Sequence, residues 1–191
     1  LQARSTTVAV FVCAMTRPDE RFYLPAFADA GIEVVDVCAP TSPPLRAELR
    51  ARVGAALPDD GSAVAVSIAA YAAWLERRRP RVVHAFLDAT NVTAGLGALA
   101  VGVPRVVLSA RNLAPHHFAL HQAWFRPGYR ALLRSRDVRL SANSHAGAAD
   151  YAAWLGIDGG AIAVVHNGVD APHVAPSEAR ALRASPALGS P

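Results

Sequence analysis

The stretch VRLSANSHAGAADYAAWLGIDGGAIAVV, residues 138–165, decides the fold class. Its two ends are short apolar runs typical of buried strands, and its alanine-rich middle is typical of a helix. Ser144 stands where a helix N-cap is expected, and Gly156 stands where a glycine ends a helix. A strand, a helix and a second strand in this order predict a parallel β-α-β unit.

The same alternation extends over the rest of the chain. The predicted strands are residues 8–15, 32–37, 81–87, 103–110, 138–142 and 162–165. The predicted helices are residues 22–28, 45–57, 63–78, 91–100, 123–134 and 145–155, with Thr90 or Asn91 as the cap of the fourth. No hairpin turn of the Asn-Gly or Asp-Gly type joins one predicted strand directly to the next, so we expect an α/β fold with one doubly wound, mostly parallel, Rossmann-like sheet.

Composition indicates one folded domain. The chain has 191 residues, of which 52% are hydrophobic and 18% charged, so it can bury a sizeable core and is not intrinsically disordered. Its net charge is +4, and all its basic residues are arginines. Without clustering or a recognised motif, this excess does not indicate a nucleic-acid partner, and none is expected.

The cysteines and the apolar runs bear on location. Cys13 and Cys38 each lie in an apolar, strand-like run, which favours two reduced core thiols over a disulfide. No run has the roughly 18 uncharged apolar residues of a membrane span, and the first residues lack the apolar region of a signal peptide. We therefore expect a soluble, cytoplasmic protein.

The missing initial Met and the Ala/Pro/Ser-rich end predict that the chain is part of a longer one.

Polar side chains lie at or past the ends of several predicted strands. They are Thr16, Arg17, His84, Asp88, Ser109, Arg111, Asn112, Asn143, Ser144, His166 and Asn167. The carboxyl ends of parallel strands share one edge of the sheet, where ligands of open α/β sheets bind. We expect a binding site there, while helix capping is the alternative for Asn143 and Ser144.

A histidine cluster offers two alternatives. His117 and His121 are four residues apart and would share one helical face, a spacing that a metal ion can use. No second acidic or thiol ligand is near them in the sequence, so we predict no metal site. His116 and His117, with Arg111, fit a loop that meets an anionic ligand, and a solvated loop is the simpler alternative.

Arg126, Arg130 and Arg134, here called the arginine stripe, recur every four residues on the predicted helix 123–134. Trp124, Phe125 and Tyr129 lie beside them. Such a helix suits anionic lipid headgroups or a lipid-linked acceptor, and a core-packed helix with solvated arginines is the alternative.

The sequence lacks the loops that define several enzyme classes. The sequence has no G-x-G-x-x-G, no G-x-x-x-x-G-K-[ST], no G-x-S-x-G and no C-x-x-C. Dinucleotide dehydrogenases, P-loop NTPases, α/β-hydrolases and thioredoxins are therefore excluded.

Two stretches carry a family resemblance: RVVHAFLDATN, residues 81–91, and the run from Leu140 that ends in NGVD at Asp170. With the intervening strand PRVVLSARN, they resemble the N-terminal domain of family-4 glycosyltransferases of the GT-B fold. The resemblance covers about residues 8–170. It implies retaining sugar transfer from a nucleotide sugar to an acceptor held by this domain. Arg111 stands where many members have a histidine, and a guanidinium would bind a phosphate or carboxylate rather than act as a base.

The resemblance also implies a division of labour. Residues 1–170 would be the Rossmann-like acceptor-binding half of a hexosyltransferase of polysaccharide biosynthesis, with no cofactor, acting at the inner face of the membrane on a glycan or lipid-linked acceptor. Residues 171–191 would link it to a missing donor-binding domain, without which it is inactive. The acceptor or anion would meet His84, Asp88, Arg111, Asn112, His116 and His117. Asn143, Ser144, His166, Asn167 and Gly168 would line the interdomain cleft. A non-catalytic module that binds an anion or a partner protein is the alternative.

Overall fold

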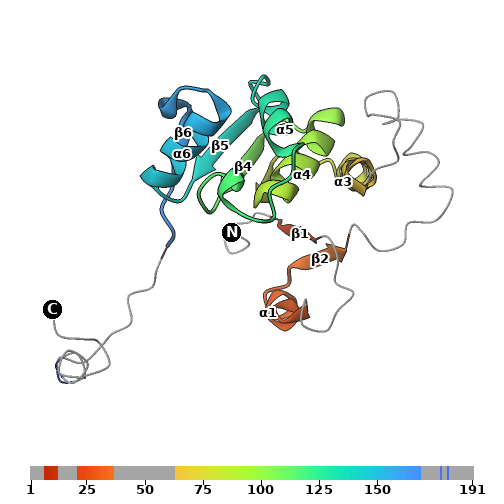
Figure 1. The fold of residues 1–191 in the computed structure, drawn as a ribbon. Helices are drawn as coiled ribbons and strands as arrows, with labels where there is room; N and C mark the ends of the chain where they lie inside the picture. Colours follow the sequence, from red (N-terminus) through yellow and green to blue (C-terminus); the bar gives the residue numbers. More distant parts are fainter. Residues whose placement is uncertain (1–6, 13–20, 37–62, 169–176, 178–179, 181–191) are drawn as a thin grey trace.

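A computed structural model describes residues 7–12, 21–36, 63–168, 177 and 180, and these form parallel strands flanked by helices (Figure 1). Four strands form the larger sheet in the order β3-β4-β5-β6, and β1 pairs with β2 in a smaller one. The strands are β1 (Ala9–Val12), β2 (Glu33–Asp36), β3 (Val83–Phe86), β4 (Val106–Ala110), β5 (Val138–Ala142) and β6 (Ile162–Val164). Every pairing between these described strands is parallel, which confirms the Rossmann-like α/β class.

The described strands differ from the expectation in forming two sheets rather than one. β2 approaches the larger body through side chains, since Val35 joins the main core and Glu33 accepts a hydrogen bond from Arg78 at the end of α3. Phe11 of β1 contacts the ring of Trp74 at 6.5 Å between ring centroids. Side-chain contacts, most of them with α3, therefore connect the smaller sheet to the rest of the described residues.

The helices are α1 (Leu24–Asp29), α3 (Ala63–Arg78), α4 (Asp88–Ala100), α5 (Phe125–Leu132) and α6 (His145–Leu155), with short 3-10 helices η3 (Pro115–His117) and η4 (Gly159–Ala161). The predicted bounds of α3, α6 and β5 are confirmed. The predicted helix 45–57, Thr16, Arg17 and both cysteines lie outside the described residues.

The quoted β-α-β unit forms for the local reasons that the sequence indicates. The Ser144 hydroxyl accepts a hydrogen bond from the backbone N–H of Gly147 at 3.1 Å, which satisfies a free donor of the first turn of α6. Gly156 ends the helix with φ of 69°, a left-handed conformation that glycine adopts without strain.

The cap predicted for α4 is wrong. The helix begins at Asp88, so Thr90 and Asn91 lie within its first turns. Asn91 is fully buried, and its amide bonds to β4 and α5 instead of capping its own helix. A buried amide needs partners, and those partners come from distant parts of the chain.

The strand order determines which face of the larger sheet is covered. Right-handed crossovers between successive neighbours bring α4, α5 and α6 to the same face. Alternate strand residues point into the core on that face, among them Ala85, Val106, Leu108, Leu140 and Ile162. The polar residues between them therefore lie on the opposite face.

Two glycines allow the covering helices to approach closely. A Cβ at Gly97 of α4 would lie 2.9 Å from the carbonyl oxygen of Ile68 in α3, and one at Gly128 of α5 would lie 2.4 Å from a methyl group of Val92 in α4. Neither distance is compatible with a side chain, so both helix pairs depend on the missing Cβ. None of the described helices has the length and hydrophobicity required to cross a membrane.

Candidate functional site

A cavity of about 580 Å³ lies on the face of the larger sheet that is opposite to α4, α5 and α6, and it extends to the carboxyl edge of that sheet. Side chains from all four strands, and the residues that follow β4 and β6, line it. They are His84, Val107, Ser109, Arg111, Arg139, Leu140, Ser141, Ala142, Ala163, Val165, His166, Asn167 and Gly168. Ligands of open α/β sheets bind at this edge, so we call this cavity the candidate site.

A row of polar side chains crosses the floor of the candidate site. His84 Nε2 lies 2.7 Å from Ser109 Oγ, and Ser109 Oγ lies 3.0 Å from Ser141 Oγ. The three residues stand on adjacent strands, where the parallel register places Ser109 beside Ser141. This row presents hydrogen-bonding groups suited to the hydroxyl groups of a polar ligand.

The electrostatics of His84 favour a neutral ring. Burial lowers the pKa of His84 below 6.5, and the positive charge of Arg111 lowers it further. At neutral pH the imidazole therefore has one donor and one acceptor nitrogen. It can orient a ligand hydroxyl without adding a charge to the site.

Arg111 supplies a cation at the carboxyl edge. Its guanidinium donates a hydrogen bond to the amide oxygen of Asn167, and its carbon Cζ lies 5.9 Å from the ring centroid of Phe86. The backbone carbonyl of Arg111 accepts a hydrogen bond from Asn143 at 3.1 Å. A guanidinium has five N–H donors, so those not used by Asn167 can meet an anionic oxygen.

The loops after β5 and β6 meet at the same edge. His166 Nδ1 lies 3.2 Å from the carbonyl oxygen of Asn143, and the rings of His166 and His145 are in edge contact at 5.6 Å. Asn143 therefore ties the residue after β4 to the residues after β6. Ser144 is occupied as the cap of α6 and does not line the cavity.

Asp88 belongs to a different group of side chains, the tyrosine network of Asp88, Asn91, Tyr129 and Tyr151. Its Oδ1 atom accepts hydrogen bonds from Tyr129 at 2.8 Å and from Tyr151 at 2.5 Å. Burial raises the pKa of both phenols, and the neighbouring Asp88 charge raises them further, so both remain protonated donors. Asp88 thus joins three helices beneath the sheet rather than lining the candidate site.

Comparison with protein families assigns the chain to a family. The model of Glycosyltransferase Family 4 matches residues 23–172, more than three quarters of the sequence, and the match includes every residue that lines the candidate site. The chain belongs to glycosyltransferase family 4.

A curated relative of this family-4 chain is the Vi polysaccharide biosynthesis protein VipC/TviE of Salmonella typhi. The two are 35% identical over 91 residues, which is 47% of this chain and 16% of the relative. The chain therefore corresponds to a small part of the length of that protein.

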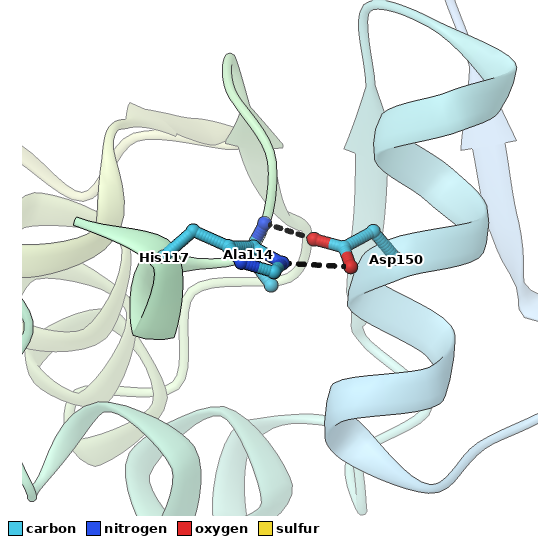
Figure 2. Close-up of polar contacts among 3 residues, drawn as sticks. All are labelled: Ala114, His117 and Asp150. Carbon is cyan, nitrogen blue, oxygen red and sulfur yellow. Dashed lines mark hydrogen bonds and ion pairs between the residues drawn. The ribbon is translucent and has the colours of Figure 1, made fainter.

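The histidine cluster of the family-4 chain has an acidic member that sequence analysis missed. His117 Nε2 lies 3.1 Å from Asp150 Oδ1, and the other carboxylate oxygen accepts a hydrogen bond from the Ala114 backbone N–H at 2.6 Å (Figure 2). His116 packs its ring against that of His117, with 3.9 Å between the centroids. His121 does not belong to this group: η3 ends at His117 and residues 118–121 are not helical, so the expected helical face is absent.

Asp150 is ionised in this arrangement. Desolvation favours the neutral carboxyl, but the hydrogen bonds from His117 and from the Ala114 backbone outweigh it, and the net pKa of Asp150 is lowered. No local pattern in α6 marks this aspartate, because its partners stand in another element of the chain.

Asn112 is exposed and does not line the cavity.

The arginine stripe is exposed, but its aromatic neighbours are not available to a membrane. Phe125 is 4% exposed and Tyr129 is fully buried, and Trp124 packs against the same core. The helix is shorter than predicted and ends before Arg134. The expected aromatic anchors are therefore wrong, because the apolar face of α5 is needed to cover the sheet.

Proposed function

We propose that this chain is the acceptor-binding part of a retaining glycosyltransferase. It would hold a glycan or lipid-linked acceptor while a hexosyl group is transferred to it from a nucleotide sugar. The observation that carries the proposal is the candidate site itself, a cavity with a row of polar side chains and a cation at the carboxyl edge of a family-4 sheet.

The chemistry of the candidate site suits such an acceptor. A sugar presents hydroxyl groups that both donate and accept hydrogen bonds, and the row of His84, Ser109 and Ser141 offers matching groups. A lipid-linked acceptor also carries phosphate, for which the Arg111 guanidinium is a suitable partner. The volume of about 580 Å³ is in the ordinary range for a small-molecule site.

The donor would be bound elsewhere. Transfer from a nucleotide sugar releases a diphosphate, and electrostatic stabilisation of such a developing charge usually contributes more to catalysis than any other effect. We assign this task to a separate donor-binding domain, with residues 171–191 as the link and Asn143, His166, Asn167 and Gly168 facing it. On this proposal the isolated chain has no transferase turnover.

The relative named for polysaccharide biosynthesis supports a glycan product. We place the reaction at the cytoplasmic face of a membrane, where the exposed arginine stripe would meet anionic headgroups. Without aromatic anchors this contact is electrostatic and reversible.

The test uses the full-length protein that contains this chain and compares two arginine substitutions. Arg111→Gln removes the cation of the candidate site, and Arg105→Gln removes the same charge just before β4, at its opposite end and outside the cavity. For Arg111→Gln we expect the acceptor KM to rise about 10- to 100-fold, since a hydrogen bond to a charged group contributes about 1.5–3 kcal/mol. Hydrolysis of the nucleotide sugar without acceptor should be unchanged.

The outcomes separate the proposal from its alternative. Wild-type kinetics in Arg105→Gln, together with a selective acceptor defect in Arg111→Gln, would support it. A loss of donor hydrolysis with an unchanged acceptor KM would overturn it, because the site would then serve the donor. Binding of inorganic phosphate without any sugar transfer by the full-length protein would favour a non-catalytic, anion-binding module.

A further inference from the structure

We propose that His116, His117 and Asp150 form a binding site for one divalent transition-metal ion of the zinc type. The inference rests on this side-chain cluster alone and does not depend on the proposed glycosyl transfer. One ligand atom from each of the three residues lies within 4.8 Å of the other two.

The donor set points to this class of metal. Two imidazoles and one carboxylate are ligands that Zn²⁺, Co²⁺ and Ni²⁺ bind well, whereas Mg²⁺ and Ca²⁺ prefer oxygen ligands alone. A zinc site with three protein ligands leaves a coordination position open for water or for an oxygen of a bound molecule.

The carboxylate is already oriented for this role. Asp150 projects from α6 toward the loop that carries η3, and the Ala114 backbone N–H holds one of its oxygens at 2.6 Å (Figure 2). Ala114 is fully buried, so this donor is a fixed part of the fold. Hydrogen bonds of this kind orient metal ligands and tune their affinity.

The two histidines need only small movements to complete the site. Bonds of about 2.1 Å place the ligands of a tetrahedral ion about 3.4 Å apart, and His117 Nε2 and Asp150 Oδ1 are already separated by 3.1 Å. The His116 ring stacks near Trp154, with 6.2 Å between ring centroids and an interplanar angle of 16°, which limits its orientation. Both histidines are exposed, so an ion can reach them without opening the core.

Binding would replace one interaction with another. In the empty site the ionised Asp150 can only accept a hydrogen bond. His117 Nε2 must therefore be the donor, so it carries a proton. When the ion binds at Nε2, that proton is carried on Nδ1 or is released to solvent. The ion then takes the place of the hydrogen bond between His117 and Asp150.

The experiment measures metal binding by the chain itself, freed of any affinity tag. Co²⁺ is titrated and followed by visible absorption, which strengthens when the hexahydrate gives way to a four- or five-coordinate site. Zn²⁺ is then added to displace it, and the bound zinc is counted by equilibrium dialysis. We expect one ion per chain, displacement by Zn²⁺ and no displacement by Mg²⁺.

The variants test the assignment of ligands. His116→Gln, His117→Gln and Asp150→Asn should each weaken binding at least tenfold. His121→Gln is the matched control, a neighbouring histidine outside the cluster, and it should bind like the wild type. Circular dichroism of each variant, with His116→Gln as the surface change least able to affect folding, separates loss of a ligand from loss of the fold.

Three results would overturn the proposal. The first is no spectral change of the wild type at a large excess of Co²⁺. The second is equal affinity for Co²⁺ of the wild type and a folded Asp150→Asn variant. That result would mean that the ion binds to the histidines without Asp150. The third is displacement of Co²⁺ by Mg²⁺ at similar concentration, which contradicts a nitrogen-containing site.

Discussion

Replacing Asn91 by leucine tests whether the buried amide holds the carboxyl edge of the sheet together. Asn91 donates to the Ser109 carbonyl at 3.0 Å and to the Tyr129 hydroxyl at 2.9 Å, and it accepts from the Ser109 backbone N–H at 3.3 Å. Leucine has a similar shape and a higher helix propensity, so neither a cavity nor a weaker helix would account for a loss of stability.

The size of the effect follows from the hydrogen bonds lost. Three bonds at about 1 kcal/mol each give a decrease of about 3 kcal/mol in the free energy of unfolding. For a chain of this length, that corresponds to a fall of roughly 6–12 °C in Tm. Among the described residues every buried side-chain nitrogen and oxygen has a partner, so no unpaired side-chain group is at hand to replace the lost amide.

The assay is urea unfolding followed by circular dichroism, with Thr93→Val as the control. Thr93 lies on the same helix, is almost as deeply buried, and makes one hydrogen bond within the helix, to the carbonyl of Ala89 at 2.8 Å. We expect its substitution to cost less than about 1 kcal/mol. If Asn91→Leu were within about 0.5 kcal/mol of the wild type, the amide would not stabilise this edge and the reasoning would be refuted.

Two further predictions concern charge. Because the pKa of His84 is lowered in the folded state, the unfolded chain binds more protons below pH 6.5, so the free energy of unfolding should fall as pH decreases through that value. His84→Gln should lose less stability than the wild type between pH 7.5 and 5.5, as measured by urea unfolding; equal losses would contradict this assignment. In cosedimentation, the chain should pellet with anionic vesicles at low salt, because each exposed arginine contributes about 1 kcal/mol. Glutamine at all three positions of the arginine stripe should abolish this binding, and equal pelleting of the variant would exclude the stripe as its cause.

The candidate site was only partly predictable. His84, Arg111, His166 and Asn167 were expected from their positions at strand ends, and they line the cavity. Ser109 was expected as well, but Arg139 and Ser141, which line the same cavity, were not. The alternation in VRLSA carried the signal, since a strand with polar residues at every second position has one face that is not packed against helices.

By itself, the sequence determined the parallel α/β class, the bounds of α3, α6 and β5, and the caps at Ser144 and Gly156. These features depend on neighbours a few residues apart, so short-range propensity is enough to specify them. Only the tertiary structure decided that Asp150 meets His117 across 33 residues and that Asp88 meets Tyr151 across 63. Such contacts arise when helices cover a sheet and buried polar groups take whatever partner the packing brings near, and no local pattern records which partner that will be.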